Sequence, residues 1–143
     1  MDKTIYDIAI SYSRVSEEFA RKLYSKLSDR FNVFMDIMAY DLLVCTYIHE
    51  ILYDIYYNRS NFAILIISQE YLTRPHPLWE ARTVVAKSVE FPDRFFIILE
   101  DDVDVKEVQK KLCINNNYIF CRMSDLDGDS DLILNIIEKR VIE

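Results

Sequence analysis

The stretch "NFAILIIS", from Asn61 to Ser68, decides the fold class of this 143-residue chain. Apolar residues follow one another inside it without interruption from Phe62 to Ile67. An apolar run of this length between polar residues is typical of a strand that is covered on both faces, as the strands of a parallel sheet are when helices lie on either side. The sequence therefore predicts a central parallel strand here.

Strand-like and helix-like patterns alternate on both sides of this central strand. The other predicted strands are short apolar runs at residues 4–11, 32–35, 94–100 and 118–120. The predicted helices show apolar residues at helical spacing, at residues 16–30, 47–56, 77–88, 104–112 and 129–143. Ser16 is the candidate N-cap of the first helix. This alternation predicts an α/β fold with a mostly parallel sheet and helices on both faces.

The loops at the carboxyl ends of the strands are the predicted location of a ligand site, because ligands of parallel α/β sheets bind there. The loops in question follow Ser11, Met35 and Ser68. No internal repeat or linker interrupts the chain, and its length is that of one typical domain. Residues 1–143 are therefore predicted to form a single domain.

Charge and cysteine content argue against several classes of function. The chain has 24 acidic and 17 basic residues, and the basic ones are scattered, which argues against nucleic acid as a partner. Its three cysteines show no C-x-x-C spacing and indicate neither a disulfide framework nor a metal site. No apolar run is long enough to cross a bilayer, and the N-terminus lacks the pattern of a signal peptide. A cytoplasmic protein without membrane attachment is predicted.

Gly128 is the only glycine in the chain, which excludes the glycine-rich loops that bind phosphate in many nucleotide-binding proteins. The stretch "DLDGDSD", from Asp125 to Asp131, lacks the glycine position of a calcium-binding EF-hand loop. It is interpreted as a turn in which Asp129 or Ser130 caps the following helix. The acidic stretch "EDDVD", residues 100–104, is likewise interpreted as a solvated loop that caps a helix rather than as a metal site.

The stretch "RPHPLWEART", from Arg74 to Thr83, contains the carboxylate of greatest interest. Glu80 lies near the predicted start of a helix, soon after the loop that follows the central strand. A carboxylate at a helix start complements the helix dipole and contributes about 0.3 to 1 kcal/mol. A carboxylate in a cleft can instead stabilise a developing cation. These residues alone favour the first role and leave the second open.

Several stretches resemble TIR (Toll/interleukin-1 receptor) domains, and most closely the bacterial ones. "YDIAISYSRVSEEFARKLYSKL" is similar to the opening strand and first helix of that family. The stretches "VFMD", "YYNRSNFAILIISQEYL" and "RFFIILEDD" follow in the family's order, so the match extends from Tyr6 to about Asp102. The resemblance implies a flavodoxin-like three-layer sandwich with a mainly parallel sheet of strand order 2-1-3-4-5.

The resemblance also implies an activity, which is cleavage of NAD+ between nicotinamide and ribose, as in many bacterial members of the family. The family's catalytic glutamate maps to Glu80. NAD+ is then the substrate, and no cofactor or metal is expected. The chain departs from the family at two places: His76 rather than tryptophan stands four residues before Glu80, and the loop after Met35 lacks the glycine often found there, around residues 42–47.

Further residues are expected around the substrate on the strength of the same resemblance. The predicted substrate-binding residues are Ser11, Tyr12, Arg14, Asp36, His76 and Trp79. Arg14 is either a donor to the pyrophosphate or an ordinary surface residue. Trp79 either stacks on nicotinamide or adenine, or anchors its helix in the core.

TIR domains of other kinds are adaptors that act through TIR–TIR contacts, and this is the non-enzymatic alternative for the chain. In either role the loop after the second strand is expected to contact another copy, since exposed apolar loops usually indicate a partner. Its apolar residues are Ile37, Met38, Leu42, Leu43 and Val44. The expected partners are NAD+, other copies of the chain and a sensor or effector protein, in antiphage or immune signalling.

Overall fold

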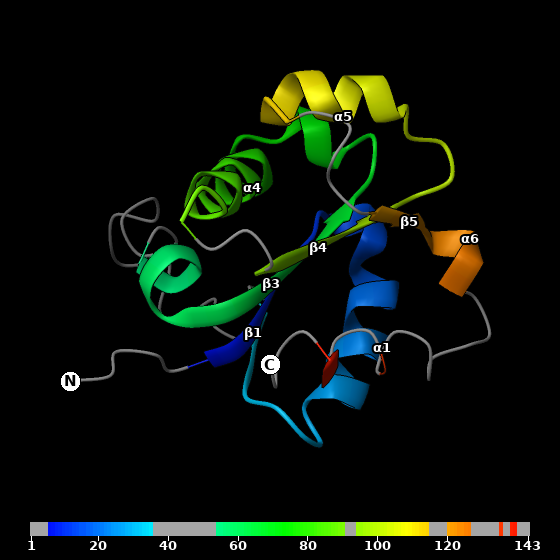
Figure 1. Ribbon diagram of the computed structural model, residues 1–143. Helices are drawn as coiled ribbons and strands as arrows, with labels where there is room; N and C mark the ends of the chain where they lie inside the picture. The colour runs from blue at the N-terminus through cyan, green and yellow to red at the C-terminus, as the bar shows by residue number, and fades with distance from the viewer. Residues whose placement is uncertain are drawn as a thin grey trace.

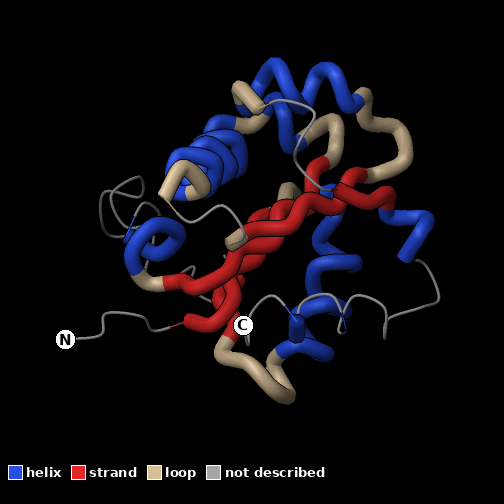
Figure 2. The backbone as a smooth tube through the Cα atoms, viewed as in Figure 1, coloured by secondary structure: helices blue, strands red, loops and turns tan. Residues whose placement is uncertain are grey.

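A five-stranded sheet forms the centre of the computed structural model (Figure 1), which describes residues 6–35, 54–90, 94–114 and 120–126, together with Asn135, Glu138 and Lys139. The strand order is β2-β1-β3-β4-β5, and every neighbouring pair is parallel. Figure 2 shows the strands stacked side by side, with helices on both sides of them. The predicted flavodoxin-like α/β fold and its strand order are confirmed.

The strands lie close to their predicted positions. They are β1 (Tyr6–Ser11), β2 (Val33–Met35), β3 (Ser60–Ile67), β4 (Phe95–Leu99) and β5 (Phe120–Arg122). The central strand β3 pairs Ala63 with Ala9 of β1 on one side and with Phe95 of β4 on the other. The edge strand β5 ends at Arg122 rather than at Phe120, because its pairing with β4 continues until Arg122 lies opposite Leu99.

Helical segments connect the strands. They are η1 (Arg14–Ser16), α1 (Glu17–Leu27), η3 (Asp54–Asn58), η4 (Tyr71–Thr73), α4 (Pro75–Lys87), α5 (Val105–Leu112) and α6 (Met123–Leu126). Ser16 is the N-cap of α1 as predicted, although its side chain makes no capping hydrogen bond. The short helix α6 has no predicted counterpart. Within the described residues, no helix combines the length and apolar character that crossing a membrane requires.

Two predicted helices lie mostly outside the described residues. The one predicted at 47–56 is described only from Asp54, where the π-helical segment η3 begins. Of the one predicted at 129–143, only Asn135, Glu138 and Lys139 are described, all in helical conformation. The turn and cap predicted around Gly128 also lie outside the described residues.

Side chains alternate between two cores along the strands, one on each face of the sheet. The core beneath α4 and α5 includes Ala9, Ala63, Leu65, Ile67, Ala81, Val84, Ile97, Val108 and Leu112. The core beneath α1 includes Ile8, Ile10, Ala20, Leu23, Leu27, Ile64, Ile66 and Ile98. Figure 1 shows α4 and α5 on one side of the sheet and α1 on the other. Burial on both faces explains why the central strand reads as an unbroken apolar run.

Parallel pairing places the ends of all strands at one edge of the sheet. We call this the carboxyl edge, where β1, β3 and β4 end at Ser11, Ile67 and Leu99. The opposite, amino edge is where the same strands begin. The helix α4 returns the chain from the carboxyl edge to the amino edge, where Lys87 at its end contacts Ser60 at the start of β3. The first turns of α4 therefore lie beside the predicted ligand site.

Candidate functional site

Three buried serines form a polar cluster at the carboxyl edge. Ser11 ends β1, Ser13 follows it, and Ser68 follows β3, and each is at most 3% exposed. The Oγ atoms of Ser13 and Ser68 lie 2.8 Å apart, within hydrogen-bond distance. Ser68 Oγ also accepts a hydrogen bond from the backbone N–H of Tyr71 at 3.0 Å. These bonds join the loops after β1 and β3 into one polar site.

Glu80 reaches this cluster from the second turn of α4. The helix begins at Pro75 rather than near Pro77, and its first turn holds no acidic residue. Glu80 is 0% exposed, and its Oε1 accepts a hydrogen bond from Ser11 Oγ at 2.6 Å. A favourable interaction with the helix dipole fades beyond the first turn, so it does not explain a carboxylate at this position.

The Ser11 hydroxyl that donates to Glu80 Oε1 is a neutral group. Arg14 in η1 and Arg82 in α4 are both exposed. Nε of Arg82 donates to the carbonyl of Lys111 at 3.1 Å. Burying a carboxylate costs free energy unless hydrogen bonds compensate for the lost water, so the Ser11 hydroxyl is an essential part of the environment of Glu80.

Tyr71 is a residue of this cluster that the sequence analysis does not identify. It lies in η4, is 0% exposed, and places its Oη 2.7 Å from Ser11 Oγ. A signal was available in the sequence, because a tyrosine closely follows the serine that ends the central strand, at the edge where a site is expected. A buried tyrosine needs a hydrogen-bond partner for its hydroxyl, and here that partner is Ser11.

Three other predicted site residues have different surroundings. Tyr12 is 8% exposed and packs in the core beneath α1, on the other face of the sheet. Trp79 is partly buried and packs against the core beneath α4 and α5, which supports the core-anchoring alternative. Arg14 is exposed in η1, a position that fits a surface residue and a pyrophosphate donor alike.

The remaining predictions fall on residues whose positions or side chains are not described. Asp36 lies outside the described residues, as do residues 37–47 of the loop predicted to contact a second copy. His76 lies in α4, but its side chain is not among those described. Of the predicted site residues, the structure brings Ser11 and Glu80 into direct contact.

A family model described as TIR domain matches residues 8–132. The chain belongs to the TIR domain family. The match covers β1 through β5 except for the first residues of β1, and it includes Ser11, Tyr71 and Glu80. A search of curated proteins returns no match.

Solved structures of proteins with TIR domains resemble this TIR domain over nearly its whole length. A metazoan TIR-STING receptor from C. gigas in complex with 2′,3′-cGAMP matches with a TM-score of 0.73 and 20% identity, over 96% of this chain and 40% of that chain. The TIR domains of the activated Roq1 resistosome, which recognises the pathogen effector XopQ, match with a TM-score of 0.61 and 21% identity, over 96% and 82%. This TIR domain thus spans well under half of the receptor's length, and the likeness shows a shared fold.

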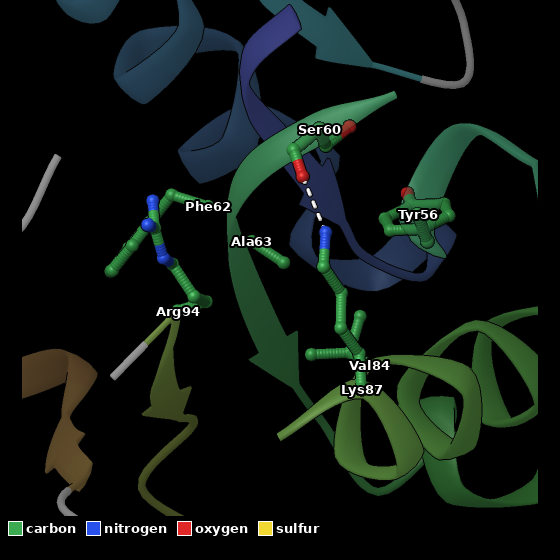
Figure 3. Close-up of a pocket in the computed structure, with 7 residues that line it drawn as sticks. All are labelled: Tyr56, Ser60, Phe62, Ala63, Val84, Lys87 and Arg94. Atoms are coloured by element: carbon green, nitrogen blue, oxygen red, sulfur yellow. Dashed lines mark hydrogen bonds between the residues drawn. The ribbon is translucent and has the colours of Figure 1, made fainter. Parts of the chain in front are cut away.

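A small pocket of this TIR domain lies at the amino edge and not beside Glu80 (Figure 3). It is lined by Tyr56, Ser60, Phe62, Ala63, Val84, Lys87 and Arg94. Nζ of Lys87 donates to the carbonyl of Ser60 at 2.6 Å, the bond drawn as a dashed line. Burial, and then the nearby charge of Arg94, lower the pKa of Lys87. Ligands of parallel sheets bind at the opposite edge, so this pocket is not the candidate site.

The acidic stretch after β4 serves as a helix-capping loop, as predicted. Asp104 is the N-cap of α5 and accepts a hydrogen bond from the backbone N–H of Lys106 at 3.1 Å. Burial, and then the charges of Asp102 and Asp101, raise the pKa of Glu100. Across the part of the chain that the structure describes, no group of three or more histidine, cysteine, aspartate or glutamate side chains is placed to hold a metal ion.

Proposed function

We propose that this chain is an NAD+ nucleosidase that cleaves the bond between nicotinamide and ribose, with Glu80 as its catalytic carboxylate. The observation that carries the proposal is the 2.6 Å hydrogen bond between Ser11 and Glu80 at the carboxyl edge of a TIR domain. It supports the proposal because a carboxylate is held by a second element of the fold at the edge where ligands of such sheets bind.

A single carboxylate is sufficient for this reaction. Most glycosidases use a second carboxyl group to protonate a poor leaving group. Nicotinamide in NAD+ already carries a positive charge, so when its bond to the ribose breaks, the electron pair moves to the ring nitrogen and neutral nicotinamide departs. The ribose is left as an oxocarbenium-like cation, which a preorganised anion stabilises. Glu80 supplies that anion in the proposed mechanism.

The second half of the reaction consumes the ribose cation. Attack by water gives ADP-ribose and releases a proton, whereas attack by an adenine nitrogen gives a cyclic product. Both routes release nicotinamide, so the proposal covers a glycohydrolase and a cyclase alike. Arg14 is exposed at the carboxyl edge, and we assign to it the pyrophosphate contact, for which a guanidinium is suited. Contacts of Asp36 and His76 with the substrate stay predictions.

Assembly is part of the proposal. Glu80 is 0% exposed in this conformation, so NAD+ reaches the carboxylate only after the surrounding side chains move. Contacts with another copy of the TIR domain are a source of free energy for that movement. The TIR domains of Roq1 lie in an activated resistosome, which supports self-association as a property of the fold in that protein. A sensor or effector partner, a bacterial source, a cytoplasmic location and an antiphage or immune role are predictions from the family.

The burial of Glu80 also favours a second candidate function, which is that of a non-catalytic adaptor. An adaptor acts through TIR–TIR surfaces and needs no access to a carboxylate. In that case the Ser11–Glu80 bond joins β1 to α4 for stability alone. The two functions differ in one measurable product, nicotinamide.

The deciding experiment is nicotinamide release from NAD+, followed by chromatography at a protein concentration high enough for self-association. Glu80→Gln removes the charge and keeps the size of the side chain. We expect it to lower the rate about 100-fold or more, because it removes the anion that faces the developing cation. Glu90→Gln is the matched control, since Glu90 is exposed in the turn that follows α4 and lies near the amino edge.

The outcomes separate the two functions. Release by the unchanged protein and by Glu90→Gln, but not by Glu80→Gln, supports the nucleosidase. Equal release by all three proteins removes Glu80 from catalysis. An assembled protein that releases no nicotinamide is an adaptor.

A further inference from the structure

The hydroxyl groups of Tyr71 and Ser11 form a chain that ends on Glu80. Tyr71 Oη lies 2.7 Å from Ser11 Oγ, and Ser11 Oγ lies 2.6 Å from Glu80 Oε1. All three side chains are 0% exposed. They come from η4, the end of β1 and α4, which are distant in sequence and meet only in the folded protein.

The donor and acceptor of each hydrogen bond in this series follow from the number of protons on each group. A serine hydroxyl has one proton to donate, and Ser11 donates it to Glu80 Oε1. The proton between Ser11 and Tyr71 therefore belongs to Tyr71, which donates to Ser11 Oγ. The O–H dipoles of Tyr71 and Ser11 thus follow one another along the hydrogen bonds, with their positive ends directed toward the carboxylate. Hydrogen bonds in such a chain polarise one another, and donors to a carboxylate favour its ionised form.

Tyr71 is itself held in place by the same polar cluster. Its backbone N–H donates to Ser68 Oγ at 3.0 Å, and Ser68 Oγ lies 2.8 Å from Ser13 Oγ. The ring of Tyr71 packs in the core beneath α4 and α5. The hydroxyl therefore has little freedom to turn away from Ser11.

We propose that Tyr71 is a positioning residue, which acts through Ser11 to keep Glu80 ionised and oriented for the reaction. The inference rests on the proposed function for its catalytic consequence. Tyr71 itself does not touch the substrate in this proposal. Its hydroxyl sets the charge state and direction of the carboxylate that does.

Tyr71→Phe tests this inference, because it removes one oxygen and keeps the ring. We expect the kcat of nicotinamide release to fall about tenfold, the value of one lost hydrogen bond between neutral hydroxyl groups, with KM little changed. The acidic limb of the pH–activity profile should move to higher pH, because the carboxylate has lost a donor that favours ionisation. A purely structural tyrosine does not move that limb.

Tyr56→Phe is the matched control. Tyr56 is also buried, at 1% exposed, and its hydroxyl also makes a hydrogen bond, to the carbonyl of Ile10 at 3.2 Å. It lies in η3 and lines the pocket at the amino edge. We expect its kcat and pH profile to match those of the unchanged protein.

A titration of the Glu80 carboxyl carbon by NMR, with labelled glutamate, separates this inference from the proposed function. Its resonance is assigned by its absence in Glu80→Gln. In Tyr71→Phe the titration midpoint should rise by about one pH unit, and Ser11→Ala, which breaks the chain at its middle, should move it in the same direction. Tyr56→Phe should leave it in place.

Each outcome decides one of the two proposals. An unchanged midpoint in both Tyr71→Phe and Ser11→Ala overturns the positioning role, whatever the activity. A raised midpoint in a protein that releases no nicotinamide supports the positioning role and refutes the nucleosidase. An active protein whose Tyr71→Phe and Tyr56→Phe variants have equal kcat and equal pH profiles refutes the catalytic part of the inference.

Discussion

A buried carboxylate held by hydroxyl groups is the most informative residue-scale feature of this TIR domain. Glu80 is 0% exposed and is bonded to Ser11 at 2.6 Å. Aspartate and glutamate side chains are rarely fully buried, because burying a charge costs free energy. This fold therefore buries Glu80 at the end of its sheet with a hydrogen bond from Ser11, whose Oγ also lies 2.7 Å from the Tyr71 hydroxyl.

The sequence could predict part of this site. Ser11 and Glu80 are identified by the resemblance to the family, because each stands at a recognisable place relative to a strand. Tyr71 could not be identified as a partner of Ser11, since the two are 60 positions apart and meet only through the packing of η4 against the end of β1. The sequence also predicts a start of α4 near Pro77 rather than at Pro75, which makes Glu80 appear to lie in the first turn.

Glu100 provides a residue-scale prediction about stability and pH. Burial and the charges of Asp102 and Asp101 raise its pKa in the folded protein, so the folded state binds this proton more tightly than the unfolded state does. Ionised Glu100 therefore lowers stability above its folded pKa, and the cost disappears as the pH falls below the unfolded value. We expect Glu100→Gln to raise Tm at pH 7 by no more than about 3 °C, because water still screens this partly buried carboxylate.

Thermal unfolding of Glu100→Gln at two pH values checks this prediction. The rise in Tm at pH 7 should vanish below about pH 4, where glutamate is protonated in both states. Glu90→Gln, which is exposed and distant from the acidic stretch, controls for the loss of one surface charge. A rise that persists at low pH would show that the effect is not electrostatic.

The order of strands and helices is the element-scale property that the sequence predicts best. Each strand contains apolar residues that face helices on both sides, so its position is visible in the sequence alone. The first and last residues of a strand or helix depend on the neighbouring elements that it contacts, so the sequence predicts them less well. The edge strand β5 extends to Arg122 because β4 continues to pair with it, and the four residues of α6 are too few to show a helical period.

Arg122 is the side chain that connects the last two strands to the loop between β4 and α5. Its Nη1 donates to the carbonyls of Val103 at 2.6 Å and Glu100 at 2.9 Å. A planar guanidinium can serve both acceptors at once, which a lysine ammonium on a flexible stem does less well. We expect Arg122→Ala to lower the free energy of unfolding by about 1 to 3 kcal/mol, and Arg122→Lys to recover only part of that loss.

Urea denaturation of the two Arg122 variants measures this effect. The midpoint should fall in the order unchanged protein, Arg122→Lys, Arg122→Ala, with similar slopes, since the same surface is exposed on unfolding. If Arg122→Ala unfolds at the same urea concentration as the unchanged protein, the two carbonyl bonds do not stabilise the edge of the sheet.

At the scale of the whole molecule, the site and the pocket lie at opposite edges of the sheet. Glu80 and Ser11 meet at the carboxyl edge, whereas the pocket around Lys87 is lined from the amino edge. A doubly wound sheet binds ligands at the carboxyl edge because the loops there diverge, while the amino edge serves stability. The proposed catalytic site is therefore at the edge where Glu80 is buried in this conformation, and in our proposal contacts between copies open it.

The last prediction is that nicotinamide release per chain depends on protein concentration. If the active species is a dimer, mass action makes the rate per chain fall about tenfold for each tenfold dilution well below the dissociation constant. The predicted interface is residues 37–44, with Leu42 and Leu43 among its apolar residues. The double variant Leu42→Ser and Leu43→Ser should weaken both self-association and activity, because it removes apolar surface that the contact buries.

Light scattering and nicotinamide release, measured on the same dilution series, test this dependence. The two curves should share one midpoint, and both should shift to higher concentration in the double variant. At protein concentrations high enough for the double variant to self-associate fully, the rate per chain should return to that of the unchanged protein, since Glu80, Ser11 and Tyr71 are unchanged. A protein that is monomeric by scattering and still turns over NAD+ at an undiminished rate would show that a single copy opens its own site, and that the burial of Glu80 is relieved by the substrate alone.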